Sequence, residues 1–126
     1  MLASERFLEG LNLFTKGYYW EAHEVWEDVW RNEEDDAKTF SQAFVQLAAA
    51  NSFVKLAKLS SAKYLFEKAL EKFQQFEQLD CEIDVSLLVR SIEAALQEFH
   101  SANGDASHRN RMIVSAVPGR NPAAKD

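Results

Sequence analysis

Residues 17–31 carry most of the side chains that could do chemistry. The segment holds one histidine, three tryptophans and four carboxylates. A helical wheel places His23 and Glu27 together at the edge of an apolar arc, with Trp20 and Glu24 beside them. Glu21 falls on the side opposite the core. An imidazole, carboxylates and an indole side by side differ from an ordinary Lys/Glu surface, so we expect a functional surface here.

A divalent metal site is the sharpest hypothesis for this surface. His23 and Glu27 are four residues apart and Glu24 and Glu27 are three apart, so their side chains can converge on a helix. Imidazole and carboxylates suit zinc, iron, manganese or nickel. The predicted metal ligands are therefore His23, Glu24 and Glu27. However, a zincin helix has a second histidine where Glu27 stands, and a di-iron bundle has a glutamate where Trp20 stands.

Three other interpretations of the same residues stay open. Glu27 and Arg31 have good i,i+4 spacing for a structural ion pair. Alternatively, Trp20, His23 and Glu24 bind a small molecule or a peptide without metal. A His23–Glu27 pair also suits a general base and its orienting group, although no nucleophile stands beside it in the sequence.

Composition bounds the class of protein. The chain has 126 residues, one domain by size, and a formal charge of −6. Residues 1–101 hold 10 Lys/Arg against 18 Asp/Glu, which argues against nucleic acid as a partner. We expect neither a membrane span nor a secretory signal, because no apolar run is long enough. The single cysteine, Cys81, lies between acidic residues that disfavour a thiolate, and its isolation fits a reducing, cytoplasmic compartment.

Apolar spacing of three and four residues predicts an all-α fold with five helices. Gly17 suits the turn between the first two helices. The expected helix N-caps are Ser4, Asp35 or Asp36, Ser60 or Ser61, and Asp84.

A shift of forty residues maps the first two helices onto the third and fourth. The matched pairs are Gly10 with Ala50, Gly17 with Ala57, Ala22 with Ala62, and Trp26 with Phe66. This repeat predicts a five-helix bundle of two antiparallel tetratricopeptide-like hairpins plus a C-terminal helix. The expected helical domain spans residues 1–101. Residues 102–126 are expected to form a mobile tail that docks through its apolar run, residues 112–114.

The segment Leu13–Arg31, with its Glu-Ala-His-Glu run, resembles the bacterial domain-of-unknown-function 309 family. Residues 44–50 and 62–70 are similar to two further blocks, so the resemblance covers roughly residues 5–76. It implies a small helical bundle, labelled a predicted metal-dependent hydrolase, and bears on Glu21, His23, Glu24, Glu27 and Gln46. Where family members tend to have a histidine and a glycine, this chain has Ser52, Phe53 and Ala57.

Three functions are therefore in competition. The first is a non-catalytic module that binds a partner or small ligand through Trp20, Glu21, His23, Glu24, Glu27 and Gln46. The second is a metal-dependent hydrolase with His23 and Glu24 or Glu27 at its site. The third is a homodimer built by Trp20 and neighbouring apolar residues.

Overall fold

The computed structural model describes residues 4–79 and 83–102, and these residues form five α-helices. The helices are α1 (Glu5–Thr15), α2 (Tyr19–Arg31), α3 (Asp35–Lys55), α4 (Leu59–Gln74) and α5 (Val85–Ala102). The described ranges contain no β-strand, so the all-α prediction is confirmed. In the same ranges, no helix is long and apolar enough to cross a membrane. The predicted tail beyond Ala102 lies outside the described residues. Cys81, in the gap between residues 79 and 83, also lies outside them.

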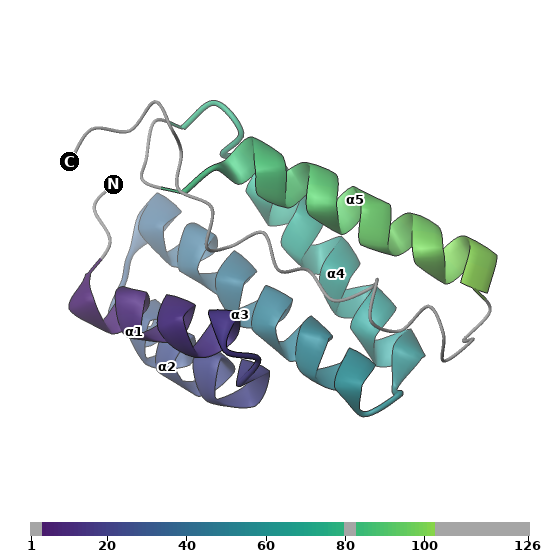
Figure 1. The fold of residues 1–126 in the computed structure, drawn as a ribbon. Helices are drawn as coiled ribbons and strands as arrows, with labels where there is room; N and C mark the ends of the chain where they lie inside the picture. The colour runs from purple at the N-terminus through teal and green to yellow at the C-terminus, as the bar shows by residue number, and fades with distance from the viewer. Residues whose placement is uncertain (1–3, 80–82, 103–126) are drawn as a thin grey trace.

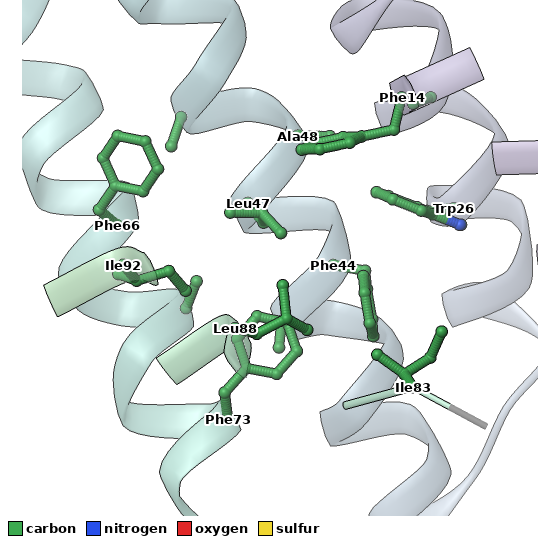
Figure 2. Close-up of a cluster of buried hydrophobic side chains, with 14 of the residues drawn as sticks. Phe14, Trp26, Phe44, Leu47, Ala48, Phe66, Phe73, Ile83, Leu88 and Ile92 are labelled. Atoms are coloured by element: carbon green, nitrogen blue, oxygen red, sulfur yellow. The ribbon is translucent and has the colours of Figure 1, made fainter. Parts of the chain in front are cut away.

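Each helix packs on the next one in the chain, and α3 lies in the middle of the bundle (Figure 1). The pair α1–α2 covers one side of α3, and the pair α4–α5 covers the other. Figure 2 shows the core running from Phe14 and Trp26 through Phe44 and Leu47 to Ile92. The long apolar stripe of α3 therefore joins both pairs into one hydrophobic core.

The two interhelical turns after α1 and α3 have the same geometry, forty residues apart. Gly17 and Ala57 both adopt left-handed backbone angles, with φ of 87° and 60°. The amide after each of them donates to a carbonyl five residues earlier, which is the Schellman motif: Tyr18 to Leu13 and Lys58 to Phe53. The sequence repeat therefore appears in the structure as a repeated helix ending.

Inside the first pair of helices, a glycine makes room for a tryptophan. A Cβ atom added to Gly10 would lie 2.2 Å from Nε1 of Trp26. Trp26 is fully buried, and its indole N–H donates to the carbonyl of Phe7 at 3.0 Å. Because this buried donor is satisfied, Trp26 fixes α2 against α1 without a hydrogen-bonding penalty.

Two of the predicted N-caps are confirmed and two are wrong. The side chains of Ser4 and Asp84 accept hydrogen bonds from the amides of Phe7 and Leu87. In contrast, the N-cap of α3 is Glu34 and that of α4 is Lys58, and neither side chain makes a capping hydrogen bond. At α4, the turn at Ala57 restarts the helix directly, which leaves no position for a serine cap.

Candidate functional site

The exposed edge of α2 carries a stacked pair of rings. Trp20 and His23 lie with ring centroids 4.5 Å apart and an interplanar angle of 15°. They are three residues apart, so the helix itself brings them together. Trp20 is 48% exposed, whereas the His23 side chain is only 16% exposed. The imidazole therefore covers part of the indole and leaves the rest facing solvent.

His23 is enclosed but not fully hydrogen-bonded. Its Nδ1 atom is buried and has no hydrogen-bond partner. Its Nε2 atom lies 3.8 Å from Oε2 of Glu27, which is too long for a hydrogen bond. Burial lowers the pKa of His23, and this outweighs the opposite influence of Glu27 and Glu24. The imidazole is therefore neutral at neutral pH and retains hydrogen-bonding capacity.

Two carboxylates of α2 form ion pairs with arginines, and two others are exposed to solvent. Glu27 accepts a hydrogen bond from Arg31 at 2.8 Å, as its spacing predicts. Asp28 accepts one from Arg6 at 2.6 Å and so ties α2 to α1. Glu21 and Glu24 are exposed. These four carboxylates line a shallow polar hollow together with Arg6, Leu13, Val25 and Arg31.

Gln46 supplies a second enclosed polar atom without a partner. Its side-chain oxygen is buried and makes no hydrogen bond. Gln46 is seven residues before Phe53, so the two residues share one face of α3. Phe53 lines a hollow with Trp20, which places this face of α3 beside α2. The grouping of Gln46 with His23 stays a prediction.

An apolar hollow, here called the turn hollow, opens beside Trp20. It joins the start of α2 to the end of α3 and has a volume of about 520 Å³. Lys55 crosses it, donating to the carbonyl of Gly17 at 3.1 Å with its ammonium 5.4 Å from the Tyr19 ring centroid. The lining residues are Gly17, Tyr18, Tyr19, Trp20, Glu21, Ser52, Phe53, Lys55 and Leu56.

Sequence reasoning did not identify the turn hollow. Its two sides are more than thirty residues apart in the chain. The repeated turns were the sequence signal that could have indicated it. Gly17 and Ala57 each end a helix, and the residues beside them, Tyr18 and Leu56, are exposed. Only the packing of α2 on α3 brings these residues together.

The side chains present do not fit a preformed metal centre. Within residues 4–79 and 83–102, no group of three or more His, Cys, Asp or Glu side chains is placed to hold a metal ion. His23 and Glu27 approach one another, while Arg31 already engages the Glu27 carboxylate. A metal ion at His23, Glu24 and Glu27 stays a prediction.

A family model matches the part of the chain that contains these residues. The model of the family described as "Domain of unknown function (DUF309)" matches residues 7–65, which include α2 and the whole of the turn hollow. No curated protein and no solved structure matches the chain. The match is shorter than the predicted resemblance over residues 5–76 but contains every candidate site residue. Over residues 7–65, the chain is similar to this family.

Proposed function

We propose that this chain is a non-catalytic binding module whose exposed α2 edge takes a positively charged group next to apolar side chains. The observation that carries the proposal is the half-exposed indole of Trp20, held in place by its stack on His23. A flat ring fixed in this way attracts cations to its open face, and partly exposed aromatic side chains are typical of binding surfaces.

The neighbouring charges favour the same class of partner. Glu21 and Glu24 are exposed on α2 close to Trp20. A lysine, arginine or amine on the indole would gain attraction from these carboxylates. The turn hollow adds an apolar surface next to the ring, lined by Phe53 and Leu56. The partner therefore combines a cation with at least one apolar group, as in a basic peptide segment.

The unpartnered nitrogen of His23 supports a binding role over a purely structural one. A buried polar atom without a hydrogen bond costs stability, typically about 1–3 kcal/mol. His23 Nδ1 and Gln46 Oε1 both belong to this class. A bound ligand that shifts either side chain would satisfy the atom and recover part of that cost.

Peptide display with the purified full chain tests the proposal. Selected peptides should carry Lys or Arg beside an apolar residue, and their binding should fall at least about tenfold in Trp20→Ala and in Glu24→Gln. The matched control is Glu67→Gln, which changes an exposed carboxylate on α4. Equal binding by the wild type and by both site variants would remove the proposal.

The metal-dependent hydrolase remains the alternative. Its support is the His23–Glu27 approach of 3.8 Å together with the label that the resemblance implies. Growth with mixed divalent metals followed by elemental analysis separates the two functions. Stoichiometric metal that is lost in His23→Ala would favour the hydrolase over the binding module.

A further inference from the structure

The apolar residues around the two repeated turns form one continuous surface. Tyr18, Trp20 and Leu56 are among the most exposed large apolar residues in the described chain, and all three line the turn hollow. Phe53 also lines a second hollow with Tyr64 and the start of α4. Clustered apolar side chains of this kind mark a surface that another segment covers.

The described structure ends on the side of α4 where α4 begins. Helix α5 runs back along α4, and its end lies toward the start of α4 (Figure 1). The ring of Phe99 packs on Phe66 at 6.0 Å, and Phe66 is seven residues into α4. At 1.5 Å per residue, this contact is about 14 Å along α4 from the turn at Ala57.

The remaining chain is long enough to reach the turn hollow. Met112–Val114 begins ten residues after Ala102, where α5 ends. An extended chain spans about 3.3 Å per residue, so ten residues cover up to about 33 Å. This span is about twice the distance along α4, and it leaves length for crossing to α2.

The chemistry of this segment complements the surface. Met112, Ile113 and Val114 form an apolar run, and Arg109 and Arg111 precede it. Residues 102–126 hold 4 Lys/Arg against 2 Asp/Glu, whereas residues 1–101 are strongly acidic. Glu21 lies in the wall of the turn hollow, so an arginine beside a docked apolar run would meet a carboxylate.

We propose that Met112–Val114 of this same chain docks in the turn hollow against Trp20 and Leu56, with Arg111 toward Glu21. The proposal rests on the function above only for the chemistry of the occupant, a cation next to apolar side chains. It adds a regulatory consequence. The chain's own segment competes with an external partner for the open face of Trp20.

Short-range fluorescence quenching tests the docking in the full-length chain. A bimane label is attached at Ser115→Cys in a Cys81→Ser background, because tryptophan quenches bimane at contact distance. Docking should remove most of the bimane emission. Trp20→Phe should restore the emission, whereas Trp30→Phe, which changes a tryptophan near the other end of α2, should not.

A second variant separates docking from other effects of removing an indole. Ile113→Asp keeps Trp20 and places a charge in the docking run, so it should also restore the emission. Circular dichroism and thermal melting confirm that each variant is folded. Unquenched emission in the parent protein, or quenching that survives Ile113→Asp, would overturn the docking.

Dilution identifies the occupant. Quenching within one chain is independent of protein concentration, whereas quenching that disappears on dilution would make the occupant a second copy and overturn the proposal. The two proposals fail separately. Peptide binding without quenching leaves the binding module standing, and quenching without peptide binding leaves the docked segment standing.

Discussion

Offset by forty residues, the hairpin of α1 and α2 and the hairpin of α3 and α4 end their first helices in the same way. Gly17 and Ala57 are both left-handed, and the amide that follows each one closes the same backbone hydrogen bond. The edges that follow these turns differ. In the first hairpin the edge holds Trp20, His23, Glu24 and Glu27, and the equivalent positions of the second hold Ser60, Lys63, Tyr64 and Glu67.

This difference distinguishes residues that the fold requires from residues that the candidate site requires. The second hairpin folds with a serine and a lysine where the first has a stacked indole and imidazole. The fold therefore does not require Trp20 or His23 at those positions, which supports a functional reason for them. The buried pairs differ as well: Gly10 and Trp26 in the first hairpin correspond to Ala50 and Phe66 in the second.

Substitution in the buried pair of Gly10 and Trp26 should give the largest change in the free energy of unfolding. Gly10→Ala should destabilise the protein by about 3 kcal/mol, because the new methyl group overlaps the Trp26 indole and disturbs its hydrogen bond. The matched change Ala50→Gly should cost only about 1 kcal/mol, from backbone entropy and a lost methyl group. Urea unfolding measures both free energies.

Combining Gly10→Ala with Trp26→Phe sharpens this comparison. The double variant reproduces the Ala50 and Phe66 pair of the second hairpin. It should be more stable than Gly10→Ala alone, because the smaller ring removes the overlap. If the two substitutions have additive costs, the steric explanation is wrong.

Exchanging the residues of the two turns, Gly17 and Ala57, should change the stability of the protein in opposite directions. Gly17→Ala should cost about 1–2 kcal/mol, a purely backbone effect because no atom lies within 4 Å of the added Cβ. Ala57→Gly should stabilise by about 0.5–1 kcal/mol, since relief of the left-handed strain exceeds the entropy gained by the unfolded chain. Thermal and urea unfolding report both signs, and a shared sign would show that the turns are not equivalent.

The smallest expected effect is the pH dependence caused by His23. Its folded pKa lies below the unfolded value, so the unfolded chain binds more protons as the pH falls from about 6.5. Stability contributed by neutral His23 is present above that pH and is lost on acidification. The drop in unfolding free energy between about pH 7 and about pH 5 should therefore be smaller in His23→Gln than in the wild type. A drop of equal size would mean that His23 is not desolvated in the folded chain.

Much of the fold followed from local patterns. Apolar spacing predicted the five helices, and Gly17 marked the first turn. The caps at Asp35 or Asp36 and at Ser60 or Ser61 were wrong, because backbone geometry at Glu34 and Ala57 starts those helices without a side-chain cap. A single sequence does not reveal that an alanine will adopt a glycine-like conformation.

The candidate site was predictable where it depends on one helix. Helical spacing alone placed His23 beside both Trp20 and Glu27. It did not give the burial of His23 Nδ1, which only the folded structure shows. Nor did it give the turn hollow, which needs residues from both α2 and α3.

The sequence by itself determined which residues share a helix face, because a regular helix repeats every 3.6 residues whatever surrounds it. It therefore specified the edge of indole, imidazole and carboxylates, and the forty-residue repeat of helix and turn. Tertiary structure alone decided which side chains of that edge are buried and which are exposed to solvent. The hollow at Leu56 arises from how α3 packs on α2, a contact between segments distant in the chain, and the extents to which His23 is buried and Trp20 is exposed are seen only in the folded chain.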